Sequence, residues 1–298
     1  MAQIFGIDHK MFAIGSLAIT SSVAVYSTYK LISERRQRKK TVASENVYET
    51  QKLLNEYLVF HFGAPNEVLR YDFGPKDSLD FPKRCADLCL SHYKPQQGIP
   101  NRALDIGCAV GRTSFELARV INEVIGIDFS QKFVDACNAL KESGEMKYWV
   151  LDEGALVTDL IARIDSDIDR SRTSFRQGDA CNLPVSLGQF GCVFAGNLIC
   201  RLPNPYDFLN RLPTLVARGG ILVITSPYTW LEEYTPKNLW LGGYIDKNGR
   251  KVTGFDNLKK VLGPDFDLLE DKDMPFFIRE TAHKNQWTVA HATVWRRK

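Results

Sequence analysis

The stretch Arg102-Ala-Leu-Asp105-Ile-Gly107-Cys-Ala-Val-Gly111 decides the fold of this 298-residue chain. Residues 102–107 are apolar enough to form a buried strand, and residues 113–122 have the spacing of an amphipathic helix. The two glycines permit a tight turn and a close approach of a ligand to the backbone, and the start of the helix offers free N–H groups. The stretch therefore predicts a strand, a ligand-binding turn and a helix.

Strands and helices alternate on both sides of this stretch. Two helices, over 45–62 and 77–93, are expected before it. After it we expect strands over 123–128, 174–179, 190–195 and 219–225, and helices over 130–143 and 207–217, the first N-capped by Ser130 and the second kinked at Pro213. Late strands are expected near 266–271 and 287–295, and the last alternates like an antiparallel strand. This order is typical of an α/β fold with a doubly wound, mostly parallel sheet.

Residues 144–173 interrupt the alternation. They contain an apolar run, LVTDLIARI, and a polar run, DSDIDRSRTS. We expect an insertion that contains a helix and ends in an exposed turn, and the sequence assigns it no role.

An acidic residue ends the strand that follows the glycine turn. Asp128 stands 23 residues after Asp105, where a carboxylate accepts hydrogen bonds from both hydroxyls of a ribose. A nicotinamide- or flavin-binding turn has the spacing G-x-G-x-x-G, which admits a pyrophosphate. Here the spacing is G-x-x-x-G, with Asp105 two residues before the first glycine. That carboxylate is unfavourable beside a pyrophosphate and suits the ammonium group of a methionine moiety.

The pattern resembles the first motif of class I S-adenosylmethionine (SAM) methyltransferases, usually D-x-G-x-G-x-G, with Ala109 in place of the middle glycine. Four further elements follow in the family's order: Asp128, the segment 178–181, the fourth strand over 190–199, and the turn 218–220. The resemblance implies a Rossmann-like sheet of seven strands with SAM as the cofactor. It implies the following cofactor-binding residues: Asp105, Gly107, Cys108, Ala109, Gly111, Asp128, Phe129, Ser130, Asp179, Ala180, Cys181 and Asn197.

A narrower resemblance covers residues 46–298. Segments 48–63, 105–112, 177–184, 226–233 and 240–243 are similar to the 4-mercaptohistidine N1-methyltransferases, which occur free-standing or as the C-terminal part of the sulfoxide synthase of ovothiol biosynthesis. The resemblance implies methylation of the imidazole π-nitrogen of 5-thiohistidine, giving ovothiol A and S-adenosylhomocysteine (SAH). The iron-dependent synthase domain is not found in this sequence.

Residues for the acceptor are expected where the fourth and fifth strands end, because ligands bind at the carboxyl edge of such sheets. Arg201 is suited to pair with an amino acid carboxylate, and Asn197 lies near the same edge. Glu232 and Glu233 are candidates to select a tautomer or accept a proton, or else they are solvated loop charges. Three aromatic residues either stack on the imidazole or pack in the core: Tyr228, Trp230 and Trp240.

The first predicted helix contributes three further candidates. Tyr48 and Phe62 are expected to line the acceptor site, with packing of the N-terminal helix as the alternative for Tyr48. His61, between two phenylalanines, is a candidate catalytic residue or a packed structural histidine.

The N-terminal segment differs from the rest. Residues 1–40 hold seven Lys or Arg and two Asp or Glu, a charge of +5, whereas residues 41–298 hold 31 and 33, a charge of −2. Residues 11–29 carry no charge and precede a basic run, which predicts a membrane anchor with the catalytic domain, 41–298, in the cytoplasm. An organelle-targeting segment and a soluble helix are the alternatives.

Composition excludes several classes of function. An acidic body argues against nucleic acid as a partner. The seven cysteines have no zinc spacing and fit buried thiols, so no metal is expected. The open alternatives to a thiohistidine methyltransferase are a methyltransferase of another small molecule and a membrane-tethered, inactive SAM-binding adaptor.

Overall fold

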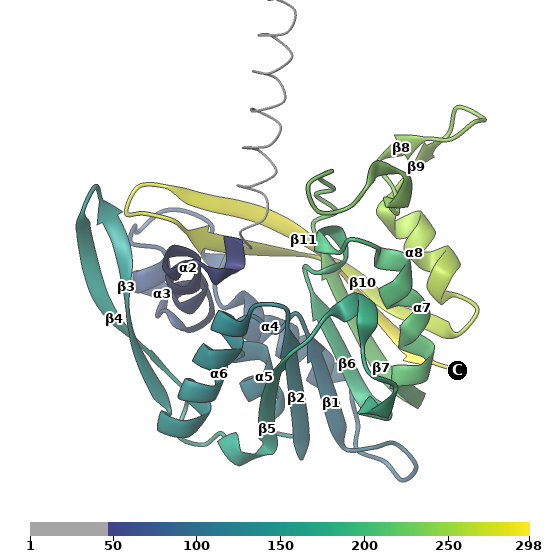
Figure 1. The fold of residues 1–298 in the computed structure, drawn as a ribbon, viewed down its shortest axis with the longest axis horizontal. Helices are drawn as coiled ribbons and strands as arrows, with labels where there is room; N and C mark the ends of the chain where they lie inside the picture. The colour runs from purple at the N-terminus through teal and green to yellow at the C-terminus, as the bar shows by residue number, and fades with distance from the viewer. Residues whose placement is uncertain (1–46) are drawn as a thin grey trace, which may run out of the picture. The chain divides into compact units, whose positions relative to one another are not determined.

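The structure is a computed structural model that describes residues 47–298. Its main sheet contains seven strands in the order β10-β11-β7-β6-β1-β2-β5 (Figure 1). The bounds of these strands are Arg102–Ile106 (β1), Glu123–Asp128 (β2), Thr173–Gln177 (β5), Phe190–Gly196 (β6), Val216–Ser226 (β7), Phe266–Arg279 (β10) and Asn285–Arg297 (β11). The predicted doubly wound, seven-stranded fold is confirmed.

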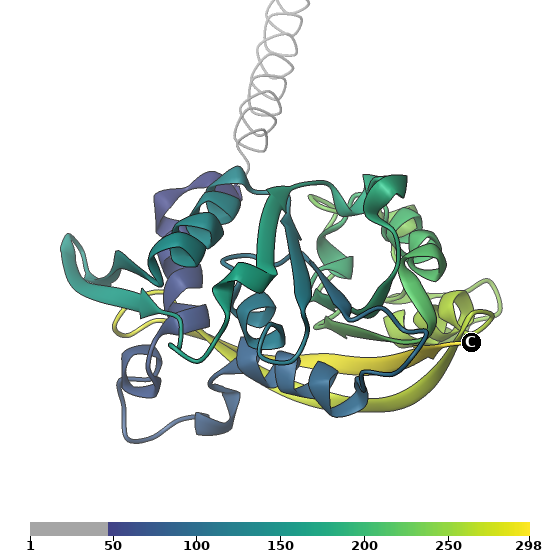
Figure 2. The ribbon, with the colours of Figure 1, turned by 90° about the horizontal axis from the view of Figure 1, so that it is seen from below.

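Strand direction also follows the prediction. The pairs β1–β2, β1–β6, β2–β5 and β6–β7 are parallel, and β11 runs antiparallel to both β7 and β10. The last hairpin is much longer than expected, because β10 and β11 pair from Phe266 opposite Arg297 to Arg279 opposite Asn285. Figure 2 shows this hairpin, in yellow, extending along the molecule beyond the parallel strands.

Helices cover both faces of the sheet. One core cluster joins α2 (Gln51–Phe62), α4 (Phe81–His92), α5 (Arg112–Leu117) and α6 (Gln131–Ser143) to one face. The other cluster joins α7 (Pro205–Leu215) and α8 (Gly254–Leu262) to the opposite face. The short helix α3 (Pro65–Val68) and several single 3-10 turns complete the helical elements, among them η1 (Val47–Glu49), η4 (Ala180–Asn182) and η6 (Ile199–Arg201). Ser130 caps α6 as predicted, since its Oγ accepts from the N–H of Phe133 at 3.2 Å.

The prediction for residues 144–173 is wrong. They form a hairpin of β3 (Glu145–Glu153) and β4 (Leu156–Arg163), not a helix. Tyr148, Val150 and Ala162 are buried while the residues on either side of each are only half-buried or exposed, the period-two pattern of a strand with one covered face. The carboxylate of Asp152 accepts from Arg70 at 2.8 Å and from Arg279 at 2.6 Å, which ties this hairpin to the β10–β11 hairpin.

The expected anchor at 11–29 and the expected boundary after residue 40 lie outside the described residues. Among residues 47–298, no helix has the length and apolar character needed to cross a bilayer.

Candidate active site

The glycine turn connects β1 to α5 at the carboxyl edge of the parallel strands. Gly107 and Gly111 have φ of +75° and +86°, and Ala109 between them has φ of +48°. The N–H groups of Gly107 and Cys108 donate to the carbonyl of Ile127 at 2.7 and 3.1 Å, which fixes the turn against β2. A Cβ on Gly111 would lie 3.0–3.2 Å from three side chains, so these side chains would have to move slightly to admit one.

Asp105 lies beneath this turn and is fully buried. Its Oδ2 accepts from the Ser114 hydroxyl at 2.6 Å, whereas its Oδ1 has no hydrogen-bond partner. Burial raises the pKa of the Asp105 carboxyl to about 7, and the Ser114 hydrogen bond opposes part of that rise. An unpaired buried carboxylate oxygen needs a donor, and an ammonium group supplies one with the complementary charge.

Asp128 ends the neighbouring strand β2. Its two carboxylate oxygens accept from the N–H groups of Ala109 and Ser130, each at 2.9 Å. Burial raises the pKa of Asp128 to about 6, against the lowering effect of these backbone donors. Phe129, the next residue, is 63% exposed, and so offers an open aromatic face beside the carboxylate. Together they match the ribose and base of a nucleoside.

The segment after β5 lies further along the same edge. The Asp179 carboxylate accepts from the N–H of Cys181 at 2.8 Å, and the thiol of Cys181 donates to the carbonyl of Asn204 at 3.3 Å. Ala180 is buried between them. Asp179 itself is exposed, so its outer oxygen is open to solvent or a ligand.

The N-terminal turn η1 covers Asp128. The carbonyl of Tyr48 accepts from the Ser130 hydroxyl at 3.0 Å, and the ring of Tyr48 packs edge-on against Phe133 at 6.0 Å. Tyr57 of α2 packs on the same phenylalanine at 4.9 Å. Burial raises the pKa of Tyr48 to about 12 and that of Tyr57 further still, so both phenols are protonated near neutral pH.

Arg201 lies at the end of η6, after β6. Its Nη1 donates to the carbonyl of Thr229 at 2.7 Å and to that of Cys200 at 3.1 Å, and its Nη2 donates to the Thr229 hydroxyl at 3.0 Å. Burial raises the pKa of Tyr48, and the nearby Arg201 charge opposes part of that rise. The structure thus brings together the predicted residues Tyr48 and Arg201 from distant parts of the chain.

Asn197 lies between β6 and η6 in the left-handed conformation, with φ of +53°. Its N–H donates to Thr225 and its side-chain oxygen accepts from the Thr225 hydroxyl at 3.1 Å. The residue is held at the end of β7 in a conformation that asparagine tolerates better than most residues.

Tyr228 contacts the last strand of the sheet. Its hydroxyl contacts His291 Nδ1 at 3.1 Å, and His291 Nε2 contacts the Asp271 carboxylate at 3.0 Å. Its ring lies against Gly254, where a Cβ would come within 2.5 Å of it. These contacts attach the loop after β7 to β11 and α8, a positioning role that the sequence did not indicate.

The two tryptophans and Phe62 are mainly packed. Trp230 is 9% exposed, and its Nε1 is buried without a partner. Trp240 donates to the carbonyl of Thr235 at 2.8 Å. Phe62 is buried at the end of α2 under the Arg112 guanidinium. The core-packing alternative therefore describes the placement of Trp230, and Phe62, expected at the acceptor site, is packed at the end of α2.

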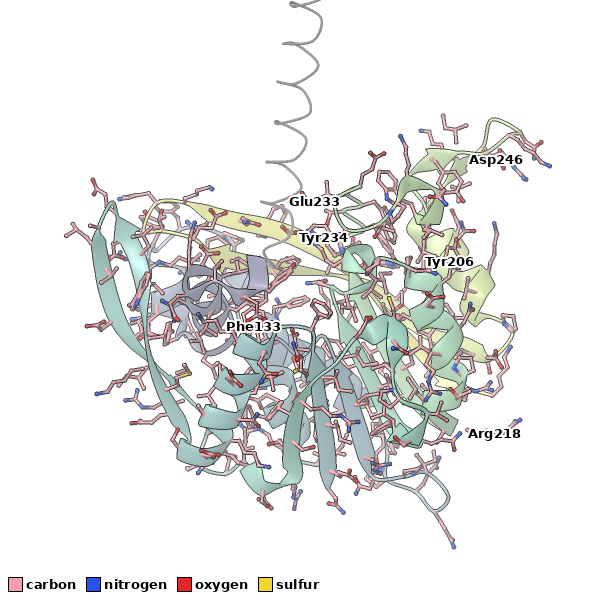
Figure 3. All side chains as sticks on the ribbon, in the orientation of Figure 1. Phe133, Tyr206, Arg218, Glu233, Tyr234 and Asp246 are labelled. Atoms are coloured by element: carbon pink, nitrogen blue, oxygen red, sulfur yellow. The ribbon has the colours of Figure 1, made fainter. Side chains whose placement is uncertain are left out.

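His61 and the two glutamates differ in their surroundings. Burial and the nearby Arg112 lower the pKa of His61 to about 3, so its ring is neutral, and its Nδ1 is buried without a partner. Glu232 and Glu233 lie on the exposed turn 231–234. Burial raises the pKa of Tyr234, and the nearby charge of Glu233 raises it further. Figure 3 labels Glu233 and Tyr234 on this loop after β7.

Comparison with known proteins agrees with this geometry. The sequence model of a family described as "Methyltransferase domain" matches residues 104–224, which include the glycine turn, Asp128 and Asn197. Over residues 104–224 the sequence therefore carries a methyltransferase domain. SAM is its cofactor, and Asp105 and the Asp128–Phe129 pair fit the ammonium and nucleoside ends of that molecule.

Solved methyltransferases of low sequence identity resemble the structure. The N-methyltransferase NodS from Bradyrhizobium japonicum WM9, in complex with SAH, is 16% identical over 82% of this chain and 98% of its own, with a TM-score of 0.46. The magnesium protoporphyrin IX methyltransferase from Synechocystis PCC 6803, with bound SAM, is 14% identical over 84% and 98%, also at 0.46. A putative methyltransferase from Bacillus halodurans C-125 is 12% identical over 72% and 97%, again at 0.46. No curated protein matches the sequence.

One residue of the methyltransferase site was missed from sequence. The Arg201 guanidinium lies 5.0 Å from the centre of the Tyr234 ring. The position of Tyr234 directly after the Glu232-Glu233 pair was the only signal in the sequence, because its contact with Arg201 joins residues that are 33 positions apart. Within residues 47–298, no group of His, Cys, Asp or Glu is arranged to hold a metal ion.

Proposed function

We propose that this protein is an N-methyltransferase that transfers the methyl group of SAM to the imidazole π-nitrogen of 5-thiohistidine. The products are ovothiol A and SAH. The proposal rests on the sequence resemblance over residues 46–298 and on one observation in the structure: Arg201, a cation after β6, has no carboxylate partner among the described residues.

The acceptor class follows from that cation. The hydrogen bonds of Arg201 go to carbonyl, hydroxyl and thiol groups, all neutral, so within residues 47–298 no carboxylate forms an ion pair with the guanidinium. A carboxylate is the planar anion that a guanidinium binds with two parallel hydrogen bonds. A small amino acid supplies such a carboxylate and is the substrate class that these residues favour.

The chemistry is an in-line displacement. SAM supplies an activated methyl group on a sulfonium. The lone pair of the neutral ring nitrogen forms the new N–C bond as the C–S bond breaks, and the electron pair of that bond remains on sulfur. The protein's main task is alignment, so a strong base is not required. The ring proton released after transfer passes to water or to a carboxylate such as Glu233, since the buried tyrosines are protonated.

Turnover by the full-length protein tests the proposal. The protein is incubated with SAM and 5-thiohistidine, with histidine as the control acceptor, and SAH and the mass of the product are followed. We expect a singly methylated thiohistidine that disappears with Asp105→Ala. Binding of SAH without methylation of thiohistidine would contradict the substrate assignment.

A wider set of amines, imidazoles and thiols then separates the alternatives. Turnover of another acceptor favours a methyltransferase of a different small molecule. SAH binding with no turnover on any acceptor favours an inactive SAM-binding adaptor.

A further inference from the structure

Tyr234 connects the parts of the acceptor site. The Arg201 guanidinium lies over its ring, 5.0 Å from the ring centre, and the Glu233 and Tyr48 side chains are close enough to its hydroxyl to affect its pKa. The charge of Arg201 in turn lowers the pKa of Tyr48, so these two side chains are also close. We call these four residues the Arg201 cluster: Tyr48, Arg201, Glu233 and Tyr234.

The backbone around the cluster is firmly held. Thr229, at the start of the loop, accepts two hydrogen bonds from Arg201, at 2.7 and 3.0 Å. Thr235, directly after Tyr234, is fully buried and its hydroxyl donates to the carbonyl of Leu202 at 2.6 Å. The loop after β7 is therefore attached to η6 and to Leu202 on both sides of Tyr234, which fixes the backbone that carries the ring.

These contacts define how a ligand can reach Arg201. The Tyr234 ring occupies one face of the guanidinium, and Thr229 and Cys200 occupy part of its edge. A guanidinium that is stacked on a ring and held along one edge has a fixed plane, and bidentate recognition requires the anion to lie in that plane.

We propose that Tyr234 is a positioning residue that makes the acceptor site selective for substrates bearing a carboxylate. It holds the Arg201 plane toward the acceptor, and it links that plane to Tyr48, whose carbonyl is bonded to Ser130 beside Asp128. The position of the Arg201 guanidinium is thereby fixed relative to the cofactor site. The inference rests on the proposed methyltransferase activity, but not on thiohistidine being the acceptor.

The test compares acceptors that differ only in the carboxylate. KM and kcat are measured on the full-length protein for 5-thiohistidine and for its decarboxylated amine. Three variants are compared with the unchanged protein: Tyr234→Leu removes the ring, Tyr234→Phe keeps the ring and removes the hydroxyl, and Tyr206→Leu removes a half-buried tyrosine of α7 as the matched control.

We expect Tyr234→Leu to raise KM for the amino acid about tenfold or more, with kcat and the Kd of SAH within about twofold. The KM for the amine stays within about twofold, because that acceptor makes no use of Arg201. Tyr234→Phe has a smaller effect than Tyr234→Leu, and Tyr206→Leu has none. A merely structural role of the ring would impair both acceptors equally.

Equal loss for both acceptors, or an unchanged KM for the amino acid in Tyr234→Leu, would overturn the inference. If thiohistidine is not methylated, the same comparison is made with any acceptor found in the wider set and its decarboxylated form. A selective KM effect there would support the role of Tyr234 while the thiohistidine assignment fails. Methylation of thiohistidine with no selective effect on KM would support the thiohistidine assignment and overturn the role of Tyr234.

Discussion

Asp105 and Asp128, in the cofactor half of the site, end two adjacent parallel strands and are joined through one turn. In the acceptor half, Tyr48, Arg201 and Tyr234 come from an N-terminal turn, the end of β6 and the loop after β7. The first half is made by local backbone geometry, and the second exists only after distant segments have packed. A motif in the sequence can specify the first kind of site, whereas the second kind depends on tertiary contacts.

The two halves also differ in charge. The cofactor half presents two carboxyl groups whose pKa values burial raises to about 7 and about 6. The acceptor half presents Arg201, a cation among neutral partners. Each half is complementary to a different ligand group, an ammonium in one case and a carboxylate in the other. Substitutions should therefore separate cofactor binding from acceptor binding.

Asp105→Asn is expected to give the largest effect, on cofactor binding and not on acceptor binding. The variant loses the charged acceptor for the SAM ammonium, and we expect SAH to bind at least about 100-fold more weakly, or about 2.7 kcal/mol. Calorimetric titration with SAH measures this. A loss smaller than about fivefold would show that Asp105 does not contact the cofactor.

Stability provides the control for Asp105→Asn. Burial in the folded state raises the pKa of Asp105 to about 7, so folding favours the protonated carboxyl. The stability that this carboxyl confers is therefore lost as pH rises from about 4 through 7. At pH 8 without ligand the asparagine variant should therefore unfold at an equal or higher urea concentration. For the unchanged protein, SAH affinity should rise between pH 5.5 and 8, because the ammonium pairs with the ionised form.

Gly111→Ala tests whether the cofactor half depends on local backbone geometry. The alanine would adopt φ of +86° and meet the side chains of Cys137, Phe175 and Phe115. We expect a loss of about 3 kcal/mol of unfolding free energy from strain and crowding together. Gly98→Ala is the matched control, with φ of +87° and open space around the Cβ, and should lose only about 1 kcal/mol. Equal losses in urea unfolding would mean that crowding at Gly111 is unimportant.

Arg201→Gln tests the acceptor half. Removal of the charge should raise the acceptor KM about 30-fold, or about 2 kcal/mol, and leave the Kd of SAH within twofold. Steady-state kinetics at saturating SAM measure the first quantity and titration measures the second. A parallel loss of SAH affinity would show that Arg201 serves the cofactor instead.

Tyr228→Phe should have the smallest effect. It removes the hydrogen bond to His291 and retains the ring against Gly254, so we expect a loss of about 1 kcal/mol of stability and a change in kcat of about twofold. Thermal unfolding and initial rates measure the two effects. A hundredfold fall in kcat with unchanged stability would assign Tyr228 a catalytic role and contradict its placement as a support.

The sequence predicted those features that depend on neighbouring residues. The strand over 102–106, the glycine turn, Asp128 and the Ser130 cap all follow from spacing within a few residues or from one strand–helix unit. The hairpin over 145–163 was missed because it lies where the family's pattern has no counterpart, and its apolar run has no clear period. Tyr234 was missed because its partner, Arg201, is brought to it by folding. The direction of Tyr228 toward His291 likewise depends on the pairing of β11 with β7.

Ser130 has a double role in this arrangement. Its hydroxyl accepts from the N–H of Phe133 as the cap of α6 and donates to the carbonyl of Tyr48. An evolutionary constraint follows: replacement of this serine would weaken a helix start and release the turn that carries Tyr48 in one step. Among related proteins we therefore expect a hydroxyl residue at position 130 wherever an aromatic residue is kept at position 48, with the two positions changing together.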